Sequence, residues 1–317
     1  MMDVLSDILD ATKLEGTLYF STELHPPWGI RVPLHGRVAR FHLVVRGRVW
    51  VGVEGEQEPA CLDAGDLVLI PHGAVHDLRD APETQVETLD RVLEVSGFDG
   101  RGSLTWGGED RGGPTRLLCG HFALDSNVQH PFFEHLPSTI VVRREEGEGH
   151  SRLDDLIRFI SHEADAQGAG NHAVMRRLSE VLFIQALRVW ASRADHEEGL
   201  LAALADPELG ESLGQIHAEP ANDWSLETLA RAAGLSRTVF AERFKQVMGL
   251  PPMQYVTLWR MQRARLLLAE GEQTLEHIAE LVGYESAAAL SRVFKRWVGE
   301  PPGSYRRRAR GEVLPQP

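Results

Sequence analysis

Short apolar runs and turn residues alternate over the first half of the chain. Residues 41–51 and 66–70 are rich in β-branched and aromatic side chains, and Gly, Pro and Asp separate such runs. This spacing over residues 17–142 predicts short strands in an antiparallel sandwich or barrel. Glycine occupies seven of the 18 positions from 96 to 113, which favours a loop there.

The hydrophobic period becomes helical after about residue 148. Apolar side chains lie three or four positions apart at Leu153, Leu156, Ile157 and Ile160. A second run of this kind spans residues 174–190, so both segments are predicted to form amphipathic helices. Their apolar stripes pack either within the chain or against a second copy, and we expect any homodimer seam here. A third helical segment, 206–217, leads into the last part of the chain.

The C-terminal part contains an internal repeat. Six residues recur with an offset of 50, so that Phe244, Lys245, Gly249, Pro251, Pro252 and Tyr255 match Phe294, Lys295, Gly299, Pro301, Pro302 and Tyr305. With an offset of 49, Leu229, Ala230 and Gly234 match Ile278, Ala279 and Gly283. The one-residue difference falls inside the turn between the two blocks, where it is easiest to absorb. Two copies of one small unit are therefore present.

Each copy has the pattern of a helix-turn-helix. Ser225 opens a short helix over 226–233, Gly234 supplies a turn, and Ser236 caps the next helix. The second copy repeats this order with Thr274 as cap and 283–286 as turn, and a long helix over about 253–269 joins the copies. The predicted inner stripes are Phe240, Phe244, Val247 and Met248, and Leu290, Val293, Phe294, Trp297 and Val298. The predicted outer faces are Thr238, Ala241, Glu242 and Lys245, and Ala288, Ser291, Arg292 and Lys295.

Paired helix-turn-helix units indicate DNA binding. A helix fits the major groove, where its outward polar side chains read base edges. Two such helices on a rigid connector are predicted to enter successive major-groove turns about 34 Å apart and to read an asymmetric site. The alternative is a duplicated helical bundle whose exposed charges form a solvated face.

The segment from Trp224-Ser225-Leu226-Glu227-x-Leu229-Ala230 to Gly299-x-Pro301-Pro302-x-x-Tyr305-Arg306 resembles the DNA-binding domain of AraC/XylS-type transcriptional regulators, over about residues 206–308. The resemblance implies a DNA-binding regulator whose N-terminal domain senses an effector or mediates dimerisation. By position it implies base-reading roles for Thr238, Ala241, Glu242, Ala287, Ala288, Ser291 and Arg292. The candidates for phosphate contact are Arg237, Lys245, Lys295, Arg296, Arg306 and Arg307.

Glu242 departs from the family pattern, which often has Arg or another donor at this place. A carboxylate there repels phosphate and at best accepts a hydrogen bond from cytosine. We therefore expect the first copy to read less sequence than the second.

The pattern Gly65-x5-Pro71-x-Gly73-x2-His76, preceded by the strand 41–47, resembles the second motif of the cupin barrel, and the resemblance covers about residues 5–142. In metal-binding cupins this His joins a His-x-His pair and a Glu. Here the pair is absent and Arg40 lies near the expected Glu. His35, His42 and His76 are the candidate ligands, and three nitrogen donors suit zinc, iron or nickel. The alternative is that His72 and His76 only orient a turn through hydrogen bonds.

The candidate effector pocket comprises His25, Trp28, His42, His72 and His76, with Trp28 alternatively a core residue. Cys119 resembles a cysteine at this point in related cupin regulators, some of which respond to oxidants or electrophiles, and is the candidate redox residue. His121 lowers the pKa of this thiol if the two meet in space. The alternative is a buried, inert thiol.

The formal charge of the 317-residue chain is −13 and is unevenly distributed. From residue 220 onward 14 Lys and Arg face 10 Asp and Glu, which favours contact of a polyanion with the C-terminal part. Cys61 and Cys119 form no disulfide framework and suit a reducing compartment. The acidic N-terminus is unlike a secretory signal, and no apolar run has the length of a membrane span. These features predict a cytoplasmic protein that binds no membrane.

We therefore expect an α+β multidomain chain without enzymatic activity. Its parts are a cupin-like jelly-roll barrel with a sensor function over 1–145, a helical connector over 146–204, an all-α DNA-binding domain over 205–310 and a tail over 311–317. The expected partners are promoter DNA, a small-molecule effector, a second copy of the chain and, for an activator, RNA polymerase. Two alternatives are a metal-dependent cupin oxygenase or isomerase, which leaves the duplication unexplained, and an architectural DNA binder whose barrel only dimerises.

Overall fold

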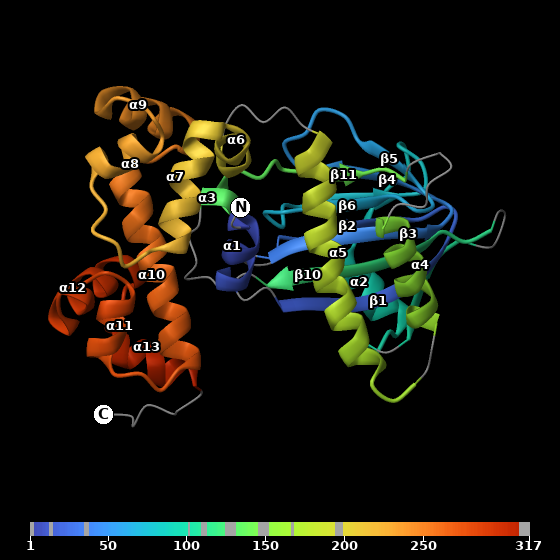
Figure 1. Ribbon diagram of the computed structural model, residues 1–317. Coiled ribbons are helices and arrows are strands. Elements are labelled where there is room, and N and C mark those ends of the chain that lie inside the picture. The colour runs from blue at the N-terminus through green and yellow to red at the C-terminus, as the bar shows by residue number, and fades with distance from the viewer. Residues whose placement is uncertain are drawn as a thin grey trace. The chain divides into compact units, whose positions relative to one another are not determined.

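The computed structural model describes residues 3–12, 15–34, 38–100, 102–108, 113–123, 131–144, 152–165, 168–193 and 199–310. The chain forms two compact units, which are best described separately (Figure 1). The sheet unit comprises Leu14–Leu124 and Leu136–Ala194. The helical unit comprises Met1–Lys13, Asp125–His135 and Asp195–Pro317.

The sheet unit contains two sheets. The strands of the six-stranded sheet are ordered β11-β6-β3-β10-β1-β9, with bounds Ile140–Val142, Leu67–Ile70, Val38–Arg46, Arg116–Ala123, Glu15–His25 and Ser103–Gly107. The strands of the five-stranded sheet are ordered β5-β4-β7-β2-β8, with bounds Ala60–Asp63, Arg48–Val53, His76–Arg79, Gly29–Val32 and Glu87–Thr88. A shared apolar core contains residues from both sheets, among them Ile30, Val44, Val51 and Leu117.

Two strand pairs are parallel, whereas the sequence pattern predicts an antiparallel arrangement. Strand β9 pairs with β1 and strand β8 pairs with β2 in parallel register. Parallel pairs require long connections between the partner strands, and both partners here are far apart in the sequence. Helix α2, Leu89–Ser96, follows β8 and is capped by Thr88 and by Gly97 in the left-handed conformation. Short alternation patterns do not encode this arrangement.

The glycine-rich stretch contains strand β9 rather than a loop alone, which corrects the prediction for residues 96–113. Leu104 in this strand is fully buried in the core between exposed neighbours. Gly107 has φ +115°, and a Cβ atom there would lie 1.9 Å from the carbonyl oxygen of His25. Glycine at position 107 therefore allows strand β9 to approach strand β1 closely.

The two amphipathic helices of the sheet unit form as predicted. Helix α4 is Arg152–Asp165 and helix α5 is Asn171–Arg193. The two helices pack on each other, and α5 also packs against β1 and β11 (Figure 1). Phe159 on α4 and Val181 on α5 are exposed although both are large and apolar.

The helical unit contains the predicted duplicated part of the chain. Its helices are α1 (Val4–Thr12), α3 (Pro131–Glu134), α6 (Gly199–Ala205), α7 (Pro207–Ala218), α8 (Leu226–Ala232), α9 (Arg237–Met248), α10 (Pro252–Glu270), α11 (Leu275–Leu281), α12 (Ala287–Val298) and α13 (Pro302–Ala309). Helix α1 packs against α7 and α10, and α3 packs against α6. Two segments from the N-terminal half thus join these helices. Within the described residues, no helix has the length and apolar character needed to cross a membrane.

Candidate nucleic-acid interface and sensor core

The first helix-turn-helix consists of α8 and α9. Ser225 accepts a hydrogen bond from the N–H of Thr228, whose hydroxyl accepts one from the N–H of Ser225, so the pair forms a capping box. Gly234 has φ +67° in the turn, a conformation that favours glycine. Ser236 then caps α9 by accepting from Val239. The predicted caps and turn are thus confirmed.

The second helix-turn-helix, α11 and α12, repeats this construction. Thr274 caps α11 and Ser286 caps α12. Gly283 has φ +75°, and a Cβ there would lie 2.9 Å from the carbonyl oxygen of Ala221. The turn glycine thus permits both the turn and a close backbone approach.

The predicted inner stripes of both second helices contain fully buried residues, the half-buried Val247, Val293 and Val298, and one exposed residue. Phe240, Phe244 and Met248 of α9, and Leu290 and Phe294 of α12, are fully buried. Trp297, in contrast, is 37% exposed, so its predicted inward position is wrong. It lies in the last turn of α12, beyond the packed stripe.

The outer faces of α9 and α12 present most of the predicted contact residues. Exposed side chains are Arg237, Thr238, Glu242, Lys245, Ala288, Arg292, Lys295, Arg296 and Arg307. Half-buried ones are Ala241, Ala287, Ser291 and Arg306. Arg306 donates to the carbonyl oxygen of Gln273 at 2.6 Å, so its guanidinium group already makes a hydrogen bond within the protein.

Helices α9 and α12 differ at the position of Val293, a predicted inner-stripe residue of α12, where α9 has Arg243. Arg243 on α9 forms an ion pair with Asp206 at 2.6 Å and a second one with Glu208. Asp206 also caps α7, so Arg243 ties the first recognition helix to the start of α7. Sequence reasoning missed this role, although the repeat gives a signal, because position 293 holds Val where position 243 holds Arg.

The exposed cations of both recognition helices lack such partners, and among the described residues this includes Arg237 and Lys245 of α9. Among the described residues, Arg292, Lys295 and Arg296 have no ion-pair partner. No acidic residue occurs within α12. This face can therefore direct three positive charges at a polyanion.

The sheet unit encloses a chain of hydrogen bonds between buried side chains. Nδ1 of His76 lies 2.8 Å from the carbonyl oxygen of Ala74, and Nε2 of His76 lies 2.8 Å from Nε2 of His42. Nδ1 of His42 lies 3.1 Å from Sγ of Cys119. Because the carbonyl only accepts, His76 donates through Nδ1 and accepts from His42 through Nε2. Nδ1 of His42 then accepts from the Cys119 thiol.

Burial keeps all three groups neutral. Burial lowers the pKa of His76 to about 4 and lowers the pKa of His42 well below its ordinary value, and the nearby positive charge of Arg40 acts in the same direction. Burial also raises the pKa of the Cys119 thiol to about 12, against the opposite effect of Arg40. Cys119 is therefore a thiol donor and not a thiolate.

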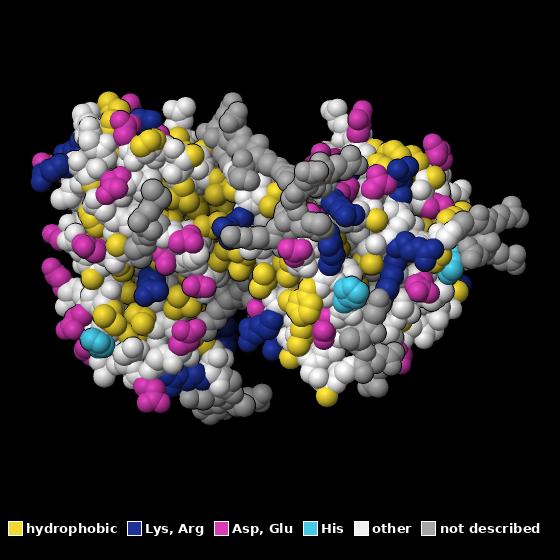
Figure 2. All heavy atoms as spheres, turned by 45° about the vertical axis from the view of Figure 1, so that its right-hand side comes forward, with side chains coloured by type: hydrophobic (Ala, Val, Ile, Leu, Met, Phe, Trp, Pro, Cys, Tyr) yellow, Lys and Arg dark blue, Asp and Glu magenta, His cyan; other side chains and the backbone are white. Residues whose placement is uncertain are grey.

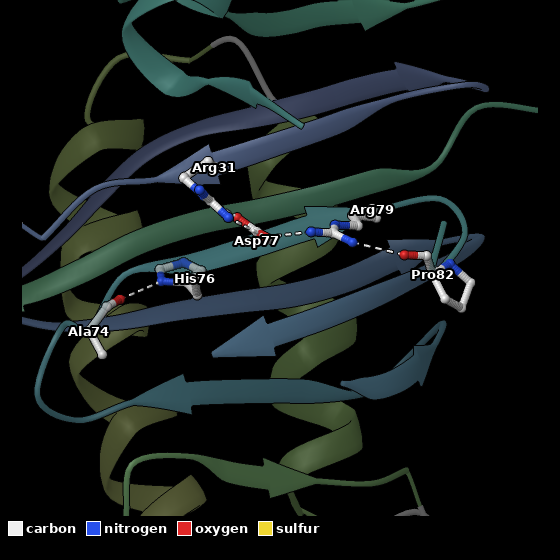
Figure 3. A network of polar contacts seen from close by, with 6 residues as sticks. All are labelled: Arg31, Ala74, His76, Asp77, Arg79 and Pro82. Carbon is white, nitrogen blue, oxygen red and sulfur yellow. Dashed lines mark hydrogen bonds and ion pairs between the residues drawn. The ribbon is translucent and has the colours of Figure 1, made fainter. Parts of the chain in front are cut away.

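Asp77, next to His76 on β7, holds this strand to its neighbour through ion pairs (Figure 3). It accepts hydrogen bonds from Arg31 at 2.7 and 3.0 Å and from Arg79 at 2.6 Å, and Arg79 also donates to the carbonyl oxygen of Pro82. Burial alone would raise the pKa of Asp77, but the hydrogen bonds and charges of both Arg side chains lower it. Because β7 pairs with β2, the network helps to fix His76 in the core.

The other predicted effector residues are not part of these hydrogen bonds, although Trp28 shares the apolar core with Cys119. Trp28 is buried in the apolar core and His25 is half-buried. His72 is exposed and donates through Nε2 to the carbonyl oxygen of Leu136. The structure thus brings together His42, His76 and Cys119, of which sequence reasoning had not joined the cysteine to the histidines.

The described residues do not form a metal centre. Cys119 approaches His42 on the side opposite to His76, so the three donors do not converge on one point. No group of three His, Cys, Asp or Glu side chains with suitable geometry occurs in the described part of the chain. The third candidate ligand, His35, lies outside the described residues.

Two capped helix-turn-helix units in one chain, with a basic outer helix, define a DNA-binding regulator that also carries a two-sheet domain. A cupin family model matches residues 3–192, and a helix-turn-helix domain model matches residues 229–308. The chain belongs to the AraC-type transcriptional regulators with an N-terminal cupin domain.

Full-length relatives agree with this assignment. An AraC-like transcription regulator of Streptomyces lividans is 33% identical over 307 residues, which cover 96% of this chain and 98% of the relative. The HTH-type transcriptional regulator AlkR of Acinetobacter baylyi is 28% identical, over 97% of this chain and 100% of the relative.

The solved DNA-binding domain of AdpA, in complex with a target DNA, is 29% identical over 33% of this chain and 95% of that chain, with a TM-score of 0.32.

Proposed function

We propose that the protein is a one-component transcription factor whose helices α9 and α12 enter successive major-groove turns of promoter DNA. The observation that most supports DNA binding is the exposed face of α12, which has no acidic residue. Among the described residues, Arg292, Lys295 and Arg296 on this helix have no ion-pair partner. Matched caps and buried Phe stripes hold both recognition helices in the same way. We further propose that the protein catalyses no reaction and acts in the cytoplasm.

Individual contacts follow from the outer faces. Thr238, Ala241, Glu242, Ala287, Ala288, Ser291 and Arg292 are proposed to face base edges, with Arg292 reading guanine. Arg237, Lys245, Lys295, Arg296, Arg306 and Arg307 are proposed to contact phosphates, which position the protein without specifying sequence. The bond from Arg306 to Gln273 makes Arg307 the stronger candidate of that pair.

The cupin domain is proposed to control DNA binding through an effector or a redox signal. Support comes from the buried chain that links Cys119, His42 and His76, because modification of the thiol would break a hydrogen bond that spans two strands. We further propose that the two sheets close into a cupin barrel and that domain limits fall near residues 145 and 204.

Alkylation of the native protein tests the thiol. Because Cys119 is buried and its pKa is raised, its alkylation in the folded chain is expected to be slow but measurable. Reaction only after unfolding would exclude a redox signal at Cys119 and leave an effector as the signal. Fast alkylation of Cys119 in the folded chain would contradict the hydrogen-bonded thiol described above.

A second copy of the chain is proposed to bind through α4 and α5. Exposed Phe159 and Val181 on these helices support this seam. Sedimentation of the Phe159→Ser variant would show more monomer than the parent chain, and a parent chain that is monomeric at high concentration would contradict the seam. RNA polymerase is the further partner expected if the protein activates transcription.

Selection from a random duplex library with the full chain tests the DNA-binding proposal. We expect enrichment of an asymmetric site with two elements about one helical turn apart. Sequence-blind, salt-sensitive binding alone would contradict it and would favour an architectural role.

A further inference from the structure

The interior between the two sheets of the sheet unit is filled largely by apolar side chains. The core cluster packs Trp28, Val44 and Leu117 with other aliphatic residues. His42, His76 and Cys119 hydrogen-bond to one another, whereas Nε1 of Trp28 is buried without a hydrogen-bond partner among the described residues. A cavity of about 260 Å³ lies elsewhere, between the end of β3, the turn from β5 to β6, the residue Arg144 after β11, and helix α4. Its size is just below the usual range of small-molecule pockets.

Helix α4 turns one complete face toward this cavity. The lining residues Asp154, Ile157, Arg158, Ser161 and His162 are spaced by three or four positions, as on one side of a helix. On the sheet side the cavity is lined by Val44, Val45, Ala64 and Gly65. The aliphatic side chains that line the cavity, Val45, Ala64 and Ile157, are its apolar wall, whereas the side chain of Val44 is fully buried in the core between the sheets.

Arg144 is held at the cavity by its backbone. Its N–H donates to Oδ1 of Asp66 at 2.8 Å, and Asp66 is buried and also paired with Arg143. Gly65 has φ +98°, and a Cβ there would lie 2.6 Å from Cδ of Arg144, so the stem of Arg144 crosses the turn where glycine leaves room. The position of this cation is thus built into the fold.

The cavity carries more positive than negative charge. Among the described residues, the guanidinium groups of Arg144 and Arg158 have no hydrogen-bond or ion-pair partner, and His162 is a third exposed donor. The single carboxylate, Asp154, is buried and has an interaction of its own. Figure 2 shows a small group of basic side chains with a histidine beside it on this unit.

We propose that this cavity binds a small organic carboxylate with an apolar body. The carboxylate would accept hydrogen bonds from Arg158 and Arg144, whose planar guanidinium groups suit two oxygen atoms. The apolar body would contact Val45, Ala64 and Ile157. An inorganic anion would leave that apolar wall without contact.

The site would connect ligand binding to regulation. A ligand held between α4 and the sheet fixes α4, which packs on α5, and α5 ends at Arg193, close in sequence to α6 and α7. Helix α7 is the element to which Arg243 ties the first recognition helix. This inference rests on the proposed regulatory function and names the effector class for it. Control requires that the carboxylate bind two arrangements of the chain with different affinity.

Calorimetry on the full chain with sodium benzoate, sodium hexanoate and sodium 4-hydroxybenzoate tests the site, with benzamide as the uncharged control. We expect at least one carboxylate to bind and benzamide to bind more weakly. Arg158→Gln and Arg144→Gln should each weaken carboxylate binding about tenfold or more. Arg177→Gln, on the exposed side of α5 and paired with Glu180, is the matched control and should leave binding unchanged. Circular dichroism shows that each variant folds.

The outcomes separate this inference from the proposed function. DNA affinity of the full chain is measured first without any carboxylate, and it reports on the proposed function alone. A carboxylate that binds, depends on both arginines and changes DNA affinity supports the inference. The inference is overturned if none of the three carboxylates binds, if the arginine variants bind as well as the parent chain, or if DNA affinity does not respond.

Discussion

The two helix-turn-helix units share a frame and differ on the face they turn outward. Phe244 and Phe294 are both fully buried at equivalent positions, and serine caps both second helices. At the outer face, Glu242 stands where the second copy has Arg292. Packing therefore constrains the inner residues of both copies to similar side chains, while the solvent-facing residues are free to specialise.

The inner side of the two units also differs at one paired tyrosine. Tyr255 is buried, and its hydroxyl lies 2.8 Å from Nε2 of His217 on α7. Its counterpart Tyr305 lies under the guanidinium groups of Arg265 and Arg308 instead. Together with the Arg243 ion pairs, this contact braces the first unit against α7. The first unit is thus attached to α7 through Arg243 and Tyr255, whereas α12 of the second unit carries an exposed face without acidic residues.

The largest expected effect tests the shared frame. Phe244→Ala and Phe294→Ala should each lower the free energy of unfolding by about 3–5 kcal/mol, because each leaves a cavity in a packed core. Urea unfolding of the full chain measures both values. Val239→Ala, at an exposed position of α9, should change stability by about 0.5 kcal/mol or less. Very different losses for the two Phe variants would contradict the equivalence of the cores.

The next effect tests the difference between the outer faces. Arg292→Ala should lose about 1–3 kcal/mol of discrimination at one base pair, since a bidentate contact to guanine disappears. Binding to the selected site and to its single-base variants measures this loss. Thr238→Ala, which removes a proposed base-reading side chain of the first copy, should cost less. Equal losses for the two variants would remove the proposed asymmetry.

A smaller effect tests the bracing of the first unit. Arg243→Ala removes two ion pairs of a partly exposed guanidinium and should cost about 1 kcal/mol or less in stability. It should also weaken binding to the half of the site that α9 contacts, as seen by footprinting. Arg231→Ala, which loses only an exposed pair with Glu227 on its own helix, is the control. Unchanged α9 footprints in Arg243→Ala would argue against bracing.

The smallest effect concerns Glu242. Replacing this exposed carboxylate by Gln removes repulsion from the phosphates, so DNA affinity should rise a few-fold at low salt and by less at high salt. Titrations of the selected site at several salt concentrations measure it. A loss of affinity in Glu242→Gln would instead mean that the carboxylate makes a favourable base contact.

Local signals in the sequence were sufficient for the caps and turns of the two helix-turn-helix units, but they were insufficient for contacts between distant segments in either unit. Caps such as Ser236 and turn glycines such as Gly234 act within a few residues, so they can be recognised directly. The pairing of Arg243 with Asp206 and the meeting of His42 with Cys119 depend on contacts between distant segments. Strand β9 was obscured because its glycines resemble those of a loop. Trp297 follows the helical period and is exposed because nothing covers it in the last turn of α12 among the described residues.

The most direct test of the account is base-by-base substitution of the selected operator, with full-chain affinity measured at one fixed salt concentration. If α12 reads more of the sequence than α9, single substitutions that cost about 1–3 kcal/mol of binding free energy concentrate in the half-site contacted by α12. Substitutions in the half contacted by α9 then cost less. Equal costs in both halves would contradict the proposed division between the two units. Affinity that is independent of sequence throughout would contradict base reading by either helix.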